Sequence, residues 1–360
     1  MKKVLLIALL LTGCLNFAIA DVITDSVPVS ARTLGMGSTG VSLVEGSYSA
    51  FMNPANLATK RNKPKIELLN LQLDFNEGGI NTIGSTKNPT SLGSTYDWLK
   101  SNTGEWAGSR FSIYPNFSSR FVSFGILYES NFAAKYDLAD PNIANSTSTL
   151  TQKGFKRLMP TGSLSFRMMG GVLKFGYTLA VDYLGVANAV VAQPETKDLS
   201  FTNGILEGVG IRHTVGTTLT LPVAHVPSFS AVVRDVGNTK YFGGSLNRTQ
   251  KMSLDVGMGH LTYVGKAIDF RWGVDFRDVM NQTKTNRMRR IFSGAELKLF
   301  QAMSLRAGFG QGSLSAGFGV KLKRINVDFS WYSAEMGNRL RDDVDSRYVL
   351  QFTWSLFNSN

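Results

Sequence analysis

The chain contains few of the residues from which metal and redox sites are built. Among 360 residues there is one cysteine, Cys14, and there are three histidines, His213, His225 and His260. A single cysteine excludes a disulfide within the chain. Three histidines so far apart do not form a zinc site of the HExxH or HxxxH kind. We therefore predict no metal and no cofactor.

Long apolar runs and catalytic motifs are also missing. No stretch of 18 consecutive apolar residues occurs, which excludes an ordinary transmembrane helix. There is no Gly-x-Ser-x-Gly motif, and the glycines of 308–312 lie between two predicted strands, with no helix to receive a phosphate. Asp269 and Asp275 are each followed by an arginine two residues on, so ion pairing explains them better than acid–base catalysis. We predict that the protein is not an enzyme.

What the chain does have is strict alternation in its C-terminal quarter. Residues 268–277 read Ile-Asp-Phe-Arg-Trp-Gly-Val-Asp-Phe-Arg, and the same period of two recurs at 303–309, 314–322, 325–331 and 348–356. A period of two puts alternate side chains on opposite faces of a strand. One face is aliphatic and aromatic, and the other is charged, polar or glycine.

Alternation of this kind fits a soluble β-sandwich as well as a membrane barrel. The strands have about the 9–11 residues needed to cross a bilayer at a tilt, and aromatic residues lie near their ends. The densely charged face suits a water-filled lumen. We therefore predict an all-β fold, a transmembrane antiparallel β-barrel, whose lumen charges include Asp255, Asp269, Arg271, Asp275, Arg277, Glu296, Lys298, Arg306, Lys321 and Asp328.

The N-terminus reads as an export signal. Lys2 and Lys3 precede an apolar run, and the small residues Ala18 and Ala20 mark a cleavage site before residue 21. An alternative is a lipobox at 11–14, in which Cys14 would be lipidated. An export signal with alternating strands and no spanning helix predicts the outer membrane of a Gram-negative bacterium. We divide the chain into a signal peptide (1–20), a non-alternating segment (21–63) and a barrel (64–360).

The non-alternating segment carries two glycine- and proline-containing motifs. They are Ala31-Arg32-Thr33-Leu34-Gly35-Met36-Gly37 and Asn53-Pro54-Ala55-Asn56-Leu57. Together they resemble the N-terminal signature of the FadL-like outer-membrane family, which includes long-chain fatty-acid transporters and PorV/PorQ-like barrels. Residues 234–239, Arg-Asp-Val-Gly-Asn-Thr, also look like an element of the PorV-like relatives.

The resemblance implies that residues 21–63 fold back into the lumen as a hatch. Pro54 is expected to end a short helix over about 47–52, and glycines permit close backbone approach. A plug without moving parts is the other reading. The hatch and gating residues implied are Gly35, Met36, Gly37, Phe51, Asn53, Pro54 and Ala55.

Turn residues divide the barrel into about fourteen strands. We place them near 65–75, 108–116, 119–131, 161–169, 172–183, 207–221, 228–236, 249–258, 267–277, 289–299, 302–309, 313–323, 325–334 and 346–356. The connections on the starting side are then short, among them 116–118 and 169–171. Most of those on the other side are long, including 76–107, 132–160 and 184–206. Short turns on one side and long loops on the other are typical of such barrels.

The loop 76–107 is predicted to contain a short amphipathic helix with Tyr96, Trp98 and Leu99, followed by Trp106. In transporters of the family such loops capture hydrophobic ligands. Anchoring at the membrane interface, or simple packing of the loop, are the alternatives.

The net charge is +12, or +10 without Lys2 and Lys3, but the basic residues are scattered. Contact with membrane lipid is therefore favoured over nucleic-acid binding. Two functions remain open. The first is a passive channel for hydrophobic or amphipathic molecules such as fatty acids, with gating by the hatch and, as the resemblance implies, lateral exit through the wall. The second is a non-transporting scaffold that binds proteins of a secretion or surface-assembly system.

Overall fold

The computed structural model describes residues 27–59, 64–84, 92–139, 146–194, 205–223, 225–264, 267–337 and 339–356. The predicted signal peptide with Cys14, and the chain end from Phe357, lie outside the described residues. None of the described helices combines the length and apolar character needed to cross a membrane.

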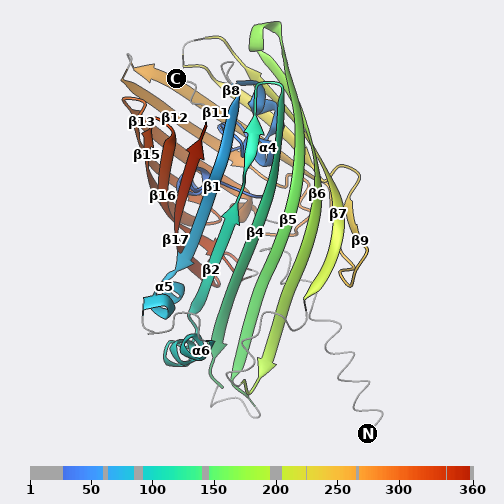
Figure 1. Ribbon diagram of the computed structural model, residues 1–360, viewed down its shortest axis with the longest axis vertical. Helices are drawn as coiled ribbons and strands as arrows, with labels where there is room; N and C mark the ends of the chain where they lie inside the picture. Colours follow the sequence, from blue (N-terminus) through green and yellow to red (C-terminus); the bar gives the residue numbers. More distant parts are fainter. Residues whose placement is uncertain are drawn as a thin grey trace.

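Strands make up most of the described chain (Figure 1). They are β1 (Lys65–Asn76), β2 (Trp106–Ile113), β3 (Asn116–Ser118), β4 (Val122–Asp137), β5 (Thr149–Met168), β6 (Leu173–Ala192), β7 (Leu206–Thr220), β8 (Ser228–Arg234), β9 (Thr239–Phe242), β10 (Thr249–Gln250), β11 (Ser253–Val264), β12 (Ile268–Phe276), β13 (Ile291–Leu299), β14 (Met303–Gly310), β15 (Ser313–Leu322), β16 (Ile325–Glu335) and β17 (Val344–Ser355). The helices are α3 (Ala31–Gly35), α4 (Ser49–Met52), α5 (Glu77–Gly84) and α6 (Leu92–Ser101), with 3-10 turns η1 (Pro54–Thr59), η2 (Met169–Gly171) and η4 (Arg287–Arg290).

The strands form one closed antiparallel barrel. Neighbours along the chain pair with each other, and β1 pairs with β17, which closes the sheet. The short strands β2 and β3 form one crossing, as do β8 and β9, and β10 and β11, so the wall has fourteen crossings. The predicted fold class and strand number are confirmed.

The two faces of the wall differ as the alternation predicts. Outward side chains are apolar and exposed, such as Phe124 at 55% and Leu350 at 46%. Inward side chains are polar and buried, such as Asp275 and Glu296 at 0%. An apolar outer wall around a polar interior is the arrangement of a barrel that spans a membrane.

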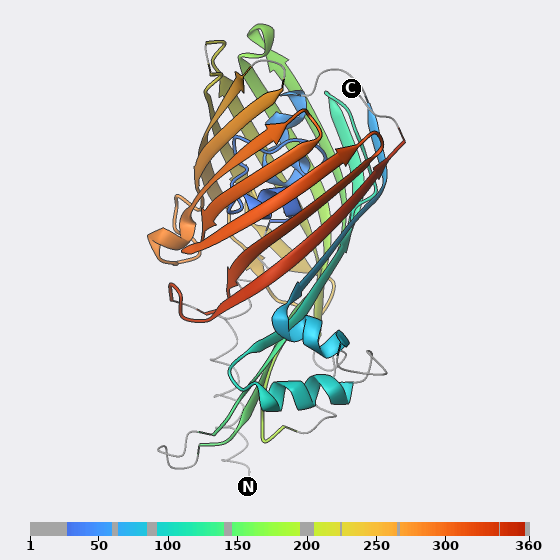
Figure 2. The ribbon, with the colours of Figure 1, turned by 90° about the vertical axis from the view of Figure 1, so that its left-hand side faces the viewer.

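The two ends of the barrel also differ. At one end, the turn end, strands are joined by short connections such as 119–121, 300–302 and 323–324. At the other, the loop end, the connections include 77–105 with α5 and α6. Figure 2 shows these helices beyond the barrel strands, beside the ends of β4, β5 and β6.

Four predicted boundaries are wrong by six or more residues, and one of them is the end of β11, which extends to Val264 and not to 258. The loop expected at 132–160 is largely strand, because β4 extends to Asp137 and β5 begins at Thr149, and the loop expected at 184–206 begins as strand, because β6 extends to Ala192. Their continuous pairing outweighs the local turn signals. We call these parts of β4, β5 and β6 the outer extension: residues 132–137, 149–154 and 187–192.

The predicted turn at 116–118 is in fact β3, which pairs with β1 and β4. Pro115 has no N–H group, so it divides the crossing into two strands without ending it. The turn lies at 119–121, where the Ser119 hydroxyl accepts hydrogen bonds from the Phe121 and Val122 amides at 3.3 and 3.1 Å.

Candidate functional site

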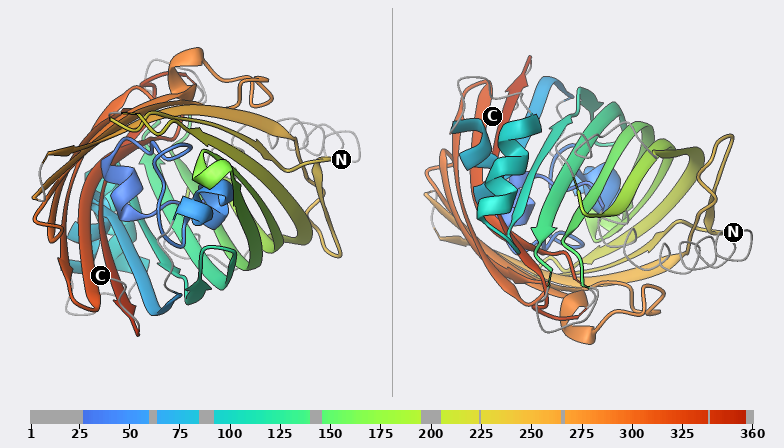
Figure 3. Two further views of the ribbon diagram at one scale, coloured as in Figure 1. Left: turned by 90° about the horizontal axis from the view of Figure 1, so that it is seen from above. Right: turned by 90° about the horizontal axis from the view of Figure 1, so that it is seen from below.

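Residues 27–59, the inner segment, lie inside the barrel, where Figure 3 shows them in blue within the ring of strands. Helix α3 contacts β14 to β17, and η1 contacts β5, β6 and β7 on another part of the wall. Most of the segment is buried, and Asn53, Ala55 and Met52 are completely so. The inner segment therefore crosses the lumen from one side to the other.

Helix α3 brings a charge into the lumen. The Ser30 hydroxyl caps the helix by accepting a hydrogen bond from the Thr33 amide. Arg32 donates two hydrogen bonds to the Glu296 carboxylate, at 2.8 and 2.6 Å. Arg306 then joins Glu296 to Asp328, at 2.9 and 2.7 Å. A bidentate pair of this kind fixes orientation as well as charge, so the arginine of the signature anchors α3 to β13.

The main chain of the inner segment is held by side chains of the wall. Among the described residues, ten hydrogen bonds of this kind occur. Their wall residues are Gln351, Ser330, Ser315, Asp275, Arg277, Thr178 and Arg234. Asp275, for example, accepts from the amides of Gly40 and Val41 at 2.6 and 2.9 Å. At about 1 kcal/mol net for each bond, the set contributes on the order of 10 kcal/mol to holding the segment.

The Asn53-Pro54-Ala55 motif is a corner that reaches two parts of the chain. Helix α4 ends at Met52, and the Asn53 side chain donates to the Val41 carbonyl at 2.7 Å and to the Thr218 hydroxyl at 3.0 Å. Its oxygen accepts from the Ala55 amide at 3.1 Å, as expected for an asparagine that satisfies backbone groups after a helix.

Arg234, at the start of the second recognised motif, meets the same corner. Its guanidinium donates to the carbonyls of Phe51 and Met52 at the end of α4, and to Asp255 at 2.7 Å. The next residue, Asp235, accepts from Arg212 and from the Thr239 hydroxyl. The motif therefore places a cation where the C-terminal carbonyls of α4 would otherwise be unpaired.

Glycines line the wall beneath the inner segment. A Cβ atom on Gly308 would overlap the main chain of Met36 and Gly37, and one on Gly176 would overlap that of Pro54 and Ala55. Gly37 itself has φ +62° and lies against the main chain of Phe309. Further wall glycines in contact with the segment are Gly216, Gly257, Gly259, Gly273, Gly294 and Gly310. The wall is thus shaped to receive a main chain at close range.

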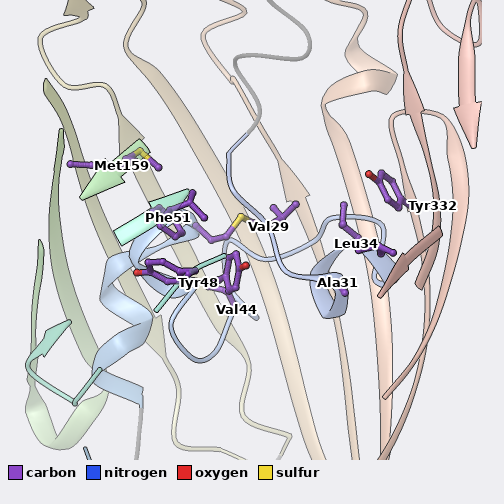
Figure 4. Packing of buried hydrophobic residues seen from close by; sticks show 13 residues of the cluster. Val29, Ala31, Leu34, Val44, Tyr48, Phe51, Met159 and Tyr332 are labelled. Atoms are coloured by element: carbon purple, nitrogen blue, oxygen red, sulfur yellow. The ribbon is translucent and has the colours of Figure 1, made fainter. Parts of the chain in front are cut away.

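One apolar cluster joins the inner segment to the wall (Figure 4). The Phe51 and Tyr48 rings lie 4.9 and 5.6 Å from the Tyr114 ring. Leu127 and Met159 complete the contact from β4 and β5. At the same level the wall contains Pro115 and Pro160, which lie on either side of Ile126.

Towards the loop end, a row of alternating charges on neighbouring strands follows directly on this cluster. On β4 and β5, Glu129 and Arg157 come two residues after Leu127 and two before Met159. Arg157 pairs with Glu129 at 3.8 Å and with Asp182 at 3.1 Å, and the pairing continues on either side. We call it the charge belt: Asp74, Arg110, Glu129, Arg157, Asp182, Arg212, Asp235, Asp345 and Arg347.

The predicted lumen charges lie in several groups. Arg271 pairs with Glu45 of the inner segment and, at 4.0 Å, with Asp269. Lys298 is partly buried, whereas Lys321, near the turn end of β15, is exposed. The remaining predicted lumen residues belong to hydrogen-bond networks that include the inner segment: Asp255, Asp275, Arg277, Glu296, Arg306 and Asp328.

The aromatic loop residues do not form one surface. Tyr96 and Leu99 of α6 pack on Ala134 and Tyr136, which belong to the same face of β4 as the outward Phe124. Trp98 lies against α5 at Gly78. On the opposite, inward face, Trp106 donates to Asp343 at 2.8 Å, while Lys135 and Lys153 lie over its ring. Ligand capture by these four residues stays a prediction.

Two cavities among the described residues lie at opposite ends of the barrel. One of about 390 Å³ lies at the tips of the outer extension, against Tyr136 and Pro194. One of about 80 Å³ lies near the turn end, between the inner segment and Lys174, Thr218 and Arg271. Neither lies between the apolar cluster and the loop end.

Sequence comparison identifies no relative: no protein-family model matches, and no curated protein matches significantly. Solved structures do match. The toluene transporter TbuX of Ralstonia pickettii aligns over 94% of this chain and 100% of its own, with a TM-score of 0.55 and 13% identity. The deltaS2S3 mutant of the monoaromatic hydrocarbon channel TodX aligns over 92% of this chain and 99% of its own, with a TM-score of 0.52 and 11% identity. The monoaromatic hydrocarbon channel CymD aligns over 92% of this chain and 97% of its own, with a TM-score of 0.50 and 12% identity.

The chain has the FadL-like barrel fold. The resemblance noted in the N-terminal motifs is thus confirmed at the level of the fold. In this FadL-like barrel Arg234 meets the end of α4 next to the Asn53 motif, although about 180 positions separate Asn53 from Arg234 in the sequence, whereas Arg32 binds Glu296 on another part of the wall. Sequence reasoning did not predict the charge belt as one group. The only signal for it is that Asp74, Arg110, Glu129 and Arg157 occupy alternate positions that face inward.

Proposed function

We propose that the protein is a passive outer-membrane channel for small hydrophobic molecules. Support comes from the apolar outer wall, and from neighbours in fold that are named as a toluene transporter and as monoaromatic hydrocarbon channels. The predicted signal peptide, the division at residues 20 and 63, and the Gram-negative outer membrane belong to the same proposal. Fatty acids as cargo stay a prediction from the family resemblance, and gating by the inner segment, which the resemblance also implies, is not part of the proposal.

The observation that carries the proposal is the apolar cluster at Phe51. It forms an apolar patch on an inner wall that is otherwise mainly polar, and it lies at the level of Pro115 and Pro160. A proline cannot donate to the strand ladder, so the wall is held by fewer hydrogen bonds there. A small apolar molecule gains about 0.8 kcal/mol for each CH₂ it buries. We place its exit through the wall at this level.

Uptake into liposomes tests the channel. Purified protein is reconstituted, and entry of labelled toluene and of a labelled fatty acid is compared with entry through an unrelated sealed barrel. Uptake no greater than that of the sealed barrel would end the proposal. Met159→Trp, which enlarges a residue of the apolar cluster, should reduce uptake. Met303→Trp, at an outward position 42% exposed, is the matched control and should not.

A scaffold for secreted or surface proteins is the second candidate, and the charge belt favours it. The belt lies between the apolar cluster and the loop end, so an apolar molecule entering along the lumen would meet paired charges. The long loop 77–105 and the outer extension would supply the binding surface. Cross-linking in intact cells tests this candidate: a partner that is captured by the wild type, and lost when 77–105 is shortened, would support it.

A further inference from the structure

We infer that the inner segment is a fixed part of the barrel and does not open as a gate. The inference rests on the proposed channel function and specifies which part of the channel stays still. It concerns the whole of 31–56, from α3 to the start of η1.

The first observation is that both halves of the segment are held independently. The half with α3 is bonded to β12, β15, β16 and β17 through Asp275, Ser315, Ser330 and Gln351. The half with α4 is bonded to β6, β7 and β8 through Thr178, Thr218 and Arg234. Moving either half alone would leave the other bonded to the wall and would break the hydrogen bonds that Asn53 and Asn56 donate to the Val41 carbonyl.

The second observation is that these contacts go mainly to the backbone. The amides of Ala31, Gly37, Gly40 and Val41 donate to wall side chains that are themselves buried. If the segment left, Asp275 and Arg234 would lose partners in the interior, where an unpaired charge is strongly unfavourable. The wall therefore opposes departure through its own charges.

The third observation is the shape of the wall. Glycines on β6, β7, β11, β12, β13 and β14 touch the segment, and the closest contacts, at Gly176, Gly294 and Gly308, admit no side chain. Such close contact is expected for a segment that stays in place. A segment that moved in and out of the lumen would not need a wall surface fitted to its main chain.

Two engineered disulfides test the inference in a Cys14→Ser background, which removes the one native cysteine. Gly35→Cys with Ser330→Cys joins α3 to β16, where the two Cβ positions are 3.2 Å apart, close to the range of natural disulfides. Asn53→Cys with Gly216→Cys joins the α4 corner to β7, where the Asn53 Cγ lies 3.2 Å from the Gly216 Cβ position. The four single-cysteine variants are the controls.

If the segment is fixed, toluene uptake by each double variant is the same when oxidised and when reduced. Uptake that is lost on oxidation and restored by dithiothreitol, in either pair but in no single variant, would overturn the inference. Absence of uptake in the unlinked wild type would count against the proposed function instead.

Hydrogen exchange of the wild-type protein gives a readout that needs neither transport nor engineered residues. The amides of Ala31, Gly37, Gly40 and Val41 should exchange as slowly as those of the barrel strands, because opening of the half with α3 would expose them. Exchange at the rate of the exposed loops would contradict a fixed segment, whatever the uptake assay gives.

Discussion

At the scale of single residues, contact with the inner segment decides what a wall position tolerates. Gly308→Ala is expected to destabilise the barrel by at least about 3 kcal/mol, the upper range for overpacking, because the new methyl group overlaps the main chain of Met36 and Gly37. The measurement is the urea concentration at which half of the protein is unfolded, detected by the loss of heat-modifiable migration on gels. Gly162→Ala is the matched control, since its nearest atoms would lie 3.6 Å away. Equal midpoints for the two variants would show that the wall does not fit the segment closely.

Arg234 is expected to be as sensitive, for an electrostatic reason. Arg234→Ala leaves Asp255 and the carbonyls of Phe51 and Met52 without their buried partner, and removing one partner of a buried pair costs about 3–5 kcal/mol. Lys240→Ala removes a charge from the exposed surface nearby and should change the urea midpoint little. A loss in Arg234→Ala no larger than in Lys240→Ala would contradict the role assigned to this arginine.

Sequence reasoning located many individual residues but not their partners. Asn53, Pro54, Arg32 and Arg234 stand out because they occur in short motifs. Glu296, by contrast, was predicted only as a lumen charge, and its contact with Arg32 joins residues 264 positions apart. Nothing local encodes a pairing of that kind, because it depends on how far each strand is shifted against its neighbours around the barrel.

At the scale of elements, strand existence was predicted well and strand length was not. Alternation gave the fourteen crossings, because a lipid-facing wall requires one apolar residue in two. The parts of β5 and β6 that extend beyond the bilayer have no such requirement. Their outward residues include Gly154, Gln152 and Ala189, which resemble loop residues locally. Helix α6, which covers these residues and stabilises them as strand, comes from a distant part of the chain.

Helix α6 is expected to stabilise the outer extension without affecting the barrel. Leu99 is completely buried against it, and truncation of such a leucine costs about 2–5 kcal/mol. Leu99→Ala should therefore make residues 92–101 and the extension sensitive to protease while heat-modifiability of the barrel is retained. Lys100→Ala, on the exposed side of the helix, should leave the digestion pattern unchanged. Loss of the folded barrel in Leu99→Ala would show instead that the two parts fold as one unit.

At the scale of the whole molecule, the structure joins an apolar exterior to a filled interior. The outward face predicts insertion into lipid, whereas the inner segment and the charge belt occupy much of the space that a wide pore would need. The two features are compatible in a channel whose apolar cargo travels close to the wall. They are equally compatible in a scaffold that uses the bilayer only as an anchor, so the exterior and the function need separate tests.

The exterior is tested by placing a charge on it. Leu350 points outward near the middle of β17, between Leu73 and Phe329 of the neighbouring strands. An arginine at mid-membrane on the lipid face of such a barrel costs about 2–4 kcal/mol, so Leu350→Arg should reduce the yield of heat-modifiable protein in lipid vesicles. Leu138→Arg makes the same substitution just beyond β4, where the side chain is 63% exposed, and should insert normally. If both variants inserted equally well, the face now assigned to lipid would have to contact water, and the protein could not be a channel through a membrane.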